Sequence, residues 1–143
     1  MSAPLVVIDT DVVVTALIGS EAASSFRLMR AVGTGEVAVA LSDAFLVELV
    51  GTVRNRHRQG FITDAARAFE IALDLGWHGE MHRPQRLDWP SVSDPEDFWM
   101  PGLAWHAEAE FIVTWDRHLL DANLPFPVEV LRPPAFLERL RQV

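Results

Sequence analysis

Two acidic residues follow apolar runs that have the composition of buried strands. Asp9 comes directly after Leu5-Val6-Val7-Ile8, and Asp116 comes two residues after the run 110–114. If both runs are parallel strands of one sheet, their carboxyl ends meet at the same edge and the two carboxylates face one crevice. Such a pair has the chemistry of a metal site.

Two further acids are candidates to join this pair. Glu48 is the only charged residue in the apolar run 44–53, and Asp97, with Asp94 as its neighbour, stands near the start of the next long helix. Carboxylates without histidine or cysteine partners form a hard oxygen site, which suits Mg²⁺ or Mn²⁺ rather than zinc. Metal ions held there could activate water and stabilise the leaving oxygen of a phosphodiester. The pattern therefore favours metal-dependent phosphodiester hydrolysis.

Each of these acids also has an ordinary structural explanation. Asp9 and Asp116 fit the N-caps of helices, and Asp94 and Asp97 would favourably meet the dipole of the helix that follows them. Glu48 could simply point to water. Their joint occurrence at the expected ends of strands nevertheless favours the functional interpretation.

Hydrophobic periodicity divides the chain into alternating strands and helices. Strands are predicted at 5–8, 37–41, 80–83, 110–114 and 128–131. In the first half of the chain, helices are predicted at 10–18, from a Ser20 cap to Gly33, from a Ser42 cap to Arg56, and from a Thr63 cap to Leu75, with Gly76 closing the last of these. In the second half they are predicted from Asp97 to about Ala109, at 117–121, and from Pro133-Pro134 onward. The last helix has Phe136, Leu137 and Leu140 facing inward.

This alternation predicts the fold class. Strands that alternate with helices are typical of a parallel sheet with right-handed crossovers and helices on both faces. We therefore expect an α/β three-layer sandwich with a central, mostly parallel sheet flanked by helices. Ligand sites in such folds lie beyond the carboxyl ends of the strands, where Asp9 and Asp116 stand.

Length and composition indicate one ordinary soluble domain over residues 1–143. The chain is long enough to bury a core, and half of its residues are hydrophobic. The lack of cysteine excludes a disulfide framework and thiolate zinc sites. The N-terminal MSAPLVVIDT lacks the regions of a signal peptide, and no apolar run approaches the length of a membrane span. The expected location is the cytoplasm, with no membrane contact.

The charge distribution bears on the kind of substrate. A formal net charge of -8 argues against a grip on nucleic acid through a broad basic surface, although bound cations would offset part of an acidic site. All 12 basic residues are arginine. Their densest run, Arg54-Asn55-Arg56-His57-Arg58, could contact the phosphates of a single strand. The alternative is a solvated helix end that suits the helix macrodipole.

Three segments of the chain together resemble a known family. VVIDTDVVVTAL, LSDAFLVELVGTV and DPEDFWMPGLAWHAEAEFIVTWDRHLLD are similar, in order and spacing, to the three acidic segments of PIN domains. The resemblance spans nearly the whole chain and is closest to the VapC-like toxins of bacterial toxin–antitoxin pairs. It implies an endoribonuclease that cleaves single-stranded RNA with Mg²⁺ or Mn²⁺, forms a homodimer and is silenced by a small antitoxin protein.

Carried over by position, the resemblance also implies the ligand set. The catalytic and metal-binding acids would be, in chain order, Asp9, Glu48, Asp97 and Asp116, with Asp94 in support. Thr114 matches the hydroxyl residue usual two positions before the fourth acid, and Thr10 matches the small polar residue after the first. Asp11 stands where the family often has asparagine.

Two positions depart from the family pattern. Trp115 replaces the glycine usual before the fourth acid, and Pro101-Gly102 interrupts the helix that follows Asp97. Proline is tolerated only in the first turn of a helix, so this helix either begins near residue 100 or is kinked there. Both departures could distort the site.

Three other classes of protein remain open. A haloacid-dehalogenase-like phosphatase would use Asp9 as a covalent nucleophile and Asp11 as a general acid. That class and the phospho-receiver domains usually have a lysine at the phosphate, which this chain lacks, and a phosphatase would leave Glu48 without a role. The third alternative is a catalytically inactive PIN-fold binding module whose site the two departures block.

Overall fold

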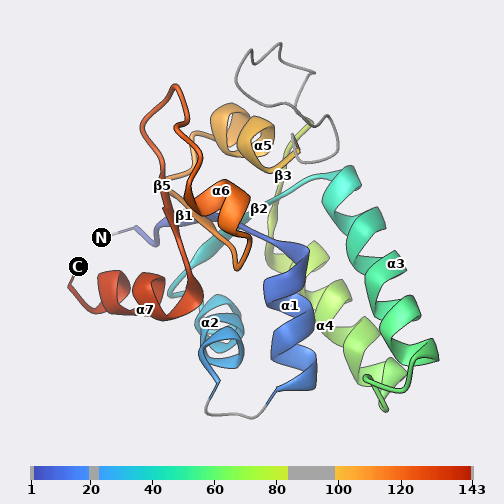
Figure 1. Ribbon diagram of the computed structural model, residues 1–143. Coiled ribbons are helices and arrows are strands. Elements are labelled where there is room, and N and C mark those ends of the chain that lie inside the picture. The colour runs from blue at the N-terminus through green and yellow to red at the C-terminus, as the bar shows by residue number, and fades with distance from the viewer. Residues whose placement is uncertain (1, 20–22, 84–98, 143) are drawn as a thin grey trace.

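The protein folds into three layers around one parallel sheet. The computed structural model describes residues 2–19, 23–83 and 99–142. Helices α1 to α4 and α7 cover one face of the sheet, while α5 and α6 cover the other (Figure 1). The predicted three-layer α/β sandwich is therefore confirmed.

In the part of the chain that the structure describes, five strands form the sheet, in the order β3-β2-β1-β4-β5, and every neighbouring pair is parallel. The strands are β1 (Leu5–Ile8), β2 (Ala38–Leu41), β3 (Glu80–Met81), β4 (Phe111–Val113) and β5 (Glu129–Leu131). From β1 the chain first builds outward through β2 to β3, and it then returns to the other side of β1 to add β4 and β5. The direction of building thus reverses between β1 and β4, which makes this the switch point of the sheet.

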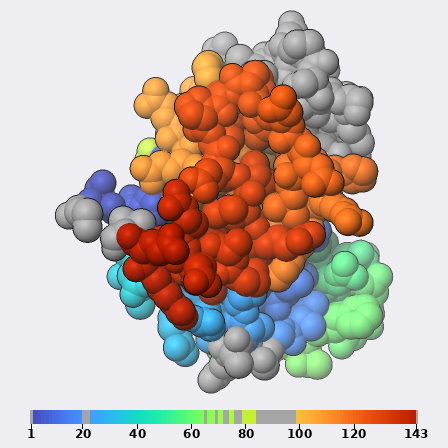
Figure 2. Space-filling model, turned by 60° about the vertical axis from the view of Figure 1, so that its left-hand side comes forward, coloured from blue at the N-terminus to red at the C-terminus, as the bar shows by residue number. Residues whose placement is uncertain are grey.

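Within the described residues, seven helices connect or follow these strands. They are α1 (Thr10–Ile18), α2 (Ser24–Gly33), α3 (Asp43–Arg58), α4 (Ala65–His78), α5 (Trp99–Ala107), α6 (Arg117–Leu120) and α7 (Pro133–Arg141). Right-handed crossovers put helices on opposite faces when the building direction reverses, which explains why α5 lies across the sheet from α1 to α4. In the space-filling view, the C-terminal segment that includes α7 covers one side of the molecule beside α2 (Figure 2).

The sheet carries a hydrophobic core on each face. Alternate residues of a strand point to opposite faces, so Val6 and Ile8 enter the core beneath α1 to α4, whereas Val7 enters the core beneath α5. All three side chains are buried, as expected of a central strand covered on both faces. The apolar run before Asp9 is therefore hydrophobic throughout because neither face meets water.

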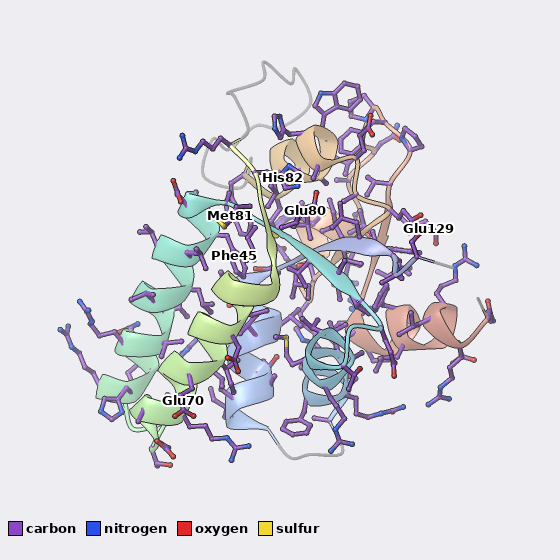
Figure 3. The ribbon with its side chains drawn as sticks, turned by 180° about the vertical axis from the view of Figure 1, so that it is seen from behind. Phe45, Glu70, Glu80, Met81, His82 and Glu129 are labelled. Carbon is purple, nitrogen blue, oxygen red and sulfur yellow. The ribbon has the colours of Figure 1, made fainter. Side chains whose placement is uncertain are left out.

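The two edge strands are short, and each carries a glutamate that contacts a basic side chain; Figure 3 labels Glu80 and Glu129. On β3, Glu80 Oε1 lies 2.9 Å from Nε2 of His82. On β5, Glu129 Oε1 lies 2.7 Å from Nη2 of Arg139 on α7. Short edges with charged side chains discourage another strand from pairing with the sheet.

Side-chain caps begin several of these helices. Ser42 Oγ accepts a hydrogen bond from the backbone N–H of Phe45 at 3.2 Å, which confirms the predicted start of α3. Helix α3 runs two residues beyond the predicted Arg56 and closes before Gly60, which has a φ of 83°. A positive φ costs glycine little, so the chain can turn away there.

The predicted bounds of two helices are wrong. Helix α2 begins at Ser24, with Ala23 as its N-cap, rather than after Ser20, which lies outside the described residues with Glu21. Helix α4 is capped by Asp64 instead of Thr63, and it continues through Gly76 to His78. A glycine inside a helix costs only about 1 kcal/mol, which the packing of a long amphipathic helix can offset.

The helix with the proline begins late enough to accept it. Helix α5 starts at Trp99, so Pro101 stands in the first turn, where its missing N–H has no partner to lose. The helix stops at Ala107 because Glu108 adopts a φ of 55°. Asp94 and Asp97 precede α5 and lie outside the described residues.

Candidate functional site at the switch point

Asp9 occupies the switch point of the sheet. It directly follows β1, and its backbone N–H donates to the carbonyl of Val113, at the end of β4, over 2.9 Å. The residue is only 6% exposed, although it carries a carboxylate. Buried carboxylates are rare unless they are paired or hydrogen-bonded, so the Asp9 carboxylate is expected to have partners nearby.

Three donors surround the Asp9 carboxylate. The strongest is the hydroxyl of Thr114, whose Oγ1 donates to Asp9 Oδ2 at 2.7 Å. On the other oxygen, Oδ1, the backbone N–H of Asp11 donates at 3.3 Å and the hydroxyl of Thr10 at 3.4 Å. Thr10 and Thr114 are themselves buried. Both positions named from the family resemblance thus contact the first acid.

Burial raises the pKa of Asp9 above its ordinary value of 3.8. Desolvation is the largest cause, and the nearby charge of Asp11 acts in the same direction. The hydrogen bond from Thr114 opposes the rise because it stabilises the ionised form. A carboxylate held in this way gains when a cation arrives, since the cation offsets the cost of keeping a negative charge away from water.

Thr114 connects Asp9 to Asp116. The Thr114 hydroxyl donates to Asp9 and at the same time accepts a hydrogen bond from the backbone N–H of Asp116 at 2.9 Å. Asp116 in turn caps α6, because its Oδ1 accepts from the backbone N–H of His118 at 2.9 Å. The side chain of Thr114 is fully buried, so this connection between the ends of β1 and β4 is shielded from water.

Asp9 and Asp116 are therefore helix caps, as the structural explanation of these residues supposed. An ionised carboxylate can accept about four hydrogen bonds, so capping leaves lone pairs on both side chains that could bind a metal ion. Asp9 uses three of them, two at 3.3 and 3.4 Å. Within the part of the chain that the structure describes, Asp116 uses one. Cap and metal ligand are compatible roles here.

The remaining predicted ligands are less fully placed. Glu48 is exposed in the second turn of α3, which begins directly after β2 at the same edge of the sheet. Across residues 2–19, 23–83 and 99–142, no three histidine or acidic side chains lie close enough together to hold a metal ion. The described acids are thus not a complete ligand set by themselves, and Asp94 and Asp97 lie outside the described residues.

Trp115 turns away from the Asp9 carboxylate. Its indole Nε1 donates to Oγ of Ser25, in the first turn of α2, at 3.2 Å. The hydroxyl of Thr15 on α1 lies 2.9 Å from the same Ser25 oxygen. The residue that replaces a glycine therefore points to the junction of α1 and α2, while the preceding Thr114 faces Asp9.

Sequence reasoning did not identify Ser25 and Thr15 as neighbours of this site. Ser25 lies 90 residues from Trp115 in the chain, and a hydroxyl on an amphipathic helix gives no sign of a partner so distant. Ser25 is buried, and a buried hydroxyl needs a hydrogen-bond partner. A serine at a helix position that faces the core was therefore the only sign in the sequence of such a bond.

The arginine run lies at the end of α3 that points away from the sheet. Arg54 and Arg58 are exposed at the C-terminal end of α3, about 16 Å or more along the helix axis from its start beside the sheet edge. Arg56 donates to Gln59 at 3.2 Å and stands 5.9 Å from the ring centre of Phe61. Arginines in a last turn suit the helix dipole, so their position needs no ligand to explain it.

The described helices have no membrane-spanning member, since none combines the necessary length and apolarity.

A parallel α/β sandwich with a buried carboxylate at its switch point defines a class of proteins that bind ligands at the carboxyl edge of the sheet. Comparison with known families identifies this one: the model of the PIN domain matches residues 5–118. The chain therefore belongs to the PIN-domain family, whose members are typically nucleases. A comparison with curated proteins found no match.

Solved structures show the same fold. PAE2754 from Pyrobaculum aerophilum has a TM-score of 0.62 and 16% sequence identity, over 99% of this chain and 91% of that one. VapBC2 from Rickettsia felis, bound to a DNA fragment from its promoter, has a TM-score of 0.56 and 16% identity, over 88% of this chain and 98% of that one. At such identities the likeness concerns the fold alone.

Proposed function

We propose that this protein is a metal-dependent endoribonuclease that cleaves single-stranded RNA and acts as the toxin of a toxin–antitoxin pair. One observation carries the proposal. The buried carboxylate of Asp9 lies at the switch point of a PIN fold and is joined through Thr114 to the segment that holds Asp116. The N-cap of α1 needs only a short polar side chain, whereas a bound cation would offset the cost of burying an ionised one.

The donors at this edge fit a hard divalent cation. Carboxylate oxygens are the ligands that Mg²⁺ and Mn²⁺ prefer, and we assign them to Asp9, Glu48, Asp97 and Asp116, with Asp94 in support. When bound, the metal would supply an activated water and stabilise the departing oxygen of the phosphodiester. Metal dependence and RNA as the substrate are both parts of this proposal.

The protein side chains would orient the site. Thr114 fixes one oxygen of Asp9 through a 2.7 Å hydrogen bond, and the N–H of Asp11 and the hydroxyl of Thr10 fix the other. Because these donors hold the carboxylate before a ligand arrives, little ordering would remain to be done on binding. Thr10, Asp11 and Thr114 are thus positioning residues in this proposal.

The partners follow from the same family. The similar structure from Rickettsia felis is of VapBC2, and by analogy we propose a small antitoxin protein that silences the site. We also propose a homodimer that acts in the cytoplasm. A contact between phosphates and Arg54, Arg56 and Arg58 is a further proposal, supported by their charge and, for Arg54 and Arg58, their exposure.

The decisive experiment is cleavage of a labelled single-stranded RNA by the purified protein with Mg²⁺, with Mn²⁺ or with a chelator. The matched control is Asp9→Asn, prepared identically, because contaminating nuclease is the main hazard. We expect cleavage that needs a divalent metal and is lost in the control. Equal cleavage by both proteins, or none on several RNAs, would contradict the proposal and favour an inactive binding module.

A second variant separates the nuclease from the phosphatase alternative. In a haloacid-dehalogenase-like enzyme, Asp11→Asn would remove the general acid and abolish hydrolysis of a small phosphate ester. In the proposed nuclease Asp11 is exposed and contributes its backbone N–H to Asp9, so the variant should keep substantial activity on RNA. Both substrates should be tested with both proteins.

A further inference from the structure

Trp115 stands between two residues of the candidate site. Thr114 before it is fully buried and faces Asp9, while Trp115 itself is 37% exposed. Asp116 follows directly, with its α-carbon about 3.8 Å away. Trp115 is therefore the chain neighbour of the proposed nuclease acid Asp116, while its indole is directed to the junction of α1 and α2.

The indole is anchored at one end. Its Nε1 donates to Ser25 Oγ at 3.2 Å, and Ser25 is only 2% exposed. The Thr15 hydroxyl, 2.9 Å from the same oxygen, connects this anchor to α1. A tryptophan with its polar edge bonded and part of its surface open to water is an amphipathic contact surface that loses little conformational freedom when it binds something.

Trp115 does not belong to the described hydrophobic core. Among the described residues, the two hydrophobic clusters that fill the faces of the sheet do not include Trp115. Tryptophan is enriched at the surfaces through which proteins contact their partners, because its large ring combines apolar area with a polar N–H.

We propose that Trp115 is a stacking platform for an unpaired base of the RNA substrate, at the nucleotide next to the cleaved bond. This inference rests on the proposed nuclease function and adds a substrate contact to it. Flat aromatic side chains stack on bases of any sequence, so Trp115 would strengthen binding without selecting one base. Because Trp115 adjoins Asp116 in the chain while its indole is directed to Ser25, we assign the stacked base to the nucleotide beside the cleaved bond and not to the nucleotides at the acids themselves.

The test uses three variants of the full-length protein. Trp115→Leu removes the aromatic face, Trp115→Phe keeps an aromatic face but loses the N–H that Ser25 accepts, and Trp105→Leu changes another exposed tryptophan, on α5. Cleavage rates are measured on a labelled 12-nucleotide single-stranded RNA of mixed sequence. A second copy of this RNA carries an abasic nucleotide next to the cleaved bond.

We expect Trp115→Leu to lower kcat/KM by about ten-fold, mostly through KM, since stacking of one base is worth on the order of ten-fold in affinity. Trp115→Phe should keep most of the activity, and Trp105→Leu should behave as the wild type. The abasic RNA should be a poorer substrate for the wild type by a similar factor but no poorer for Trp115→Leu. This last result would identify the base as the partner.

Two results would overturn the stacking role. Equal losses in the leucine and phenylalanine variants would show that the hydrogen bond to Ser25 matters rather than the aromatic face. An abasic effect that persists undiminished in Trp115→Leu would place the base elsewhere.

If the wild type cleaves no RNA, the proposed function fails, and binding of the same 12-mer decides the stacking separately. The affinities of wild type, Trp115→Leu and Trp115→Phe are then compared by fluorescence anisotropy. The same ten-fold loss, confined to the leucine variant, would support stacking by a protein that binds but does not cleave. Equal affinities would reject it.

Discussion

Replacing Thr114 by valine should destabilise the protein although the two side chains have nearly the same shape. Thr114 is fully buried, so no water can take over the role of its hydroxyl. The hydroxyl makes two hydrogen bonds at once, to Asp9 Oδ2 at 2.7 Å and from the N–H of Asp116 at 2.9 Å. Valine would leave the buried carboxylate with one donor fewer and that N–H without its acceptor.

The magnitude follows from these two bonds. A hydrogen bond to a charged group contributes about 1.5–3 kcal/mol and a neutral one about 0.5–1.5 kcal/mol, so Thr114→Val should cost about 2–4 kcal/mol. Thr114→Ser is the matched control, because it keeps the hydroxyl and loses one buried methyl group. The serine variant should cost only about 1 kcal/mol.

The cost should also depend on pH. The Thr114 hydrogen bond lowers the pKa of Asp9 against the effect of burial, so removing it raises that pKa further. A native pKa above the ordinary value of 3.8 means that the folded protein binds more protons, and its stability falls as pH rises through the native pKa. The penalty of Thr114→Val should therefore be smallest at acid pH and grow towards neutrality.

Urea denaturation of the metal-free protein in chelator, repeated over a pH series, measures these free energies of unfolding. Thr114→Val should lie well below Thr114→Ser at pH 7 and approach it in acid. A valine variant as stable as the serine variant at neutral pH would refute the reasoning, because it would show that the hydroxyl bridge contributes nothing.

Three further predictions concern single substitutions assayed by the same denaturation. Asp9→Asn should be more stable than the wild type at pH 7 in chelator, because asparagine carries no charge that burial could destabilise. The difference in the free energy of unfolding should be about 1.4 kcal/mol per pH unit between 3.8 and the native pKa of Asp9, and it should vanish as pH falls to 3.8. Gly79→Ala should cost about 1–3 kcal/mol, because its new Cβ would overlap the Leu41 side chain and lie 2.7 Å from a backbone oxygen. Ser42→Ala should cost about 1 kcal/mol through loss of the cap on α3.

Two of these predictions have a matched control. Gly51→Ala tests the effect of alanine alone, since a Cβ there meets nothing within 4 Å and Gly51 lies inside α3, so this variant should gain up to about 1 kcal/mol. Ser42→Asp keeps a capping oxygen and should recover most of the lost stability. If Asp9→Asn is less stable than the wild type at every pH, the prediction fails, because burial of the Asp9 charge would then not determine the difference in stability.

The sequence by itself predicted the order of the elements and the class of the fold. Continuous apolar runs such as 5–8 are typical of strands covered on both faces, and their alternation with amphipathic helices leaves few topologies other than a parallel sheet. It also located Asp9 and Asp116 at one edge of the sheet, because that edge follows from strand direction alone. These features depend on local composition and on the chirality of the chain, which are properties of short segments.

The ends of α2 and α4 were not predictable in the same way. Ser20 and Thr63 have the right chemistry for caps, but Ala23 and Asp64 precede the helices. Capping differs by at most about 2 kcal/mol between candidates, so packing of the whole helix decides where it begins.

Only the tertiary structure decided how the site is assembled. The bond between Thr114 and Asp9 joins residues 105 positions apart, and the bond between Trp115 and Ser25 joins residues 90 positions apart. No local pattern encodes such pairs, since each depends on the pairing of β1 with β4 and on the packing of α2. Burial of Asp9, and hence its raised pKa, is likewise a property of the assembled layers, because desolvation exists only once the surrounding segments have excluded water.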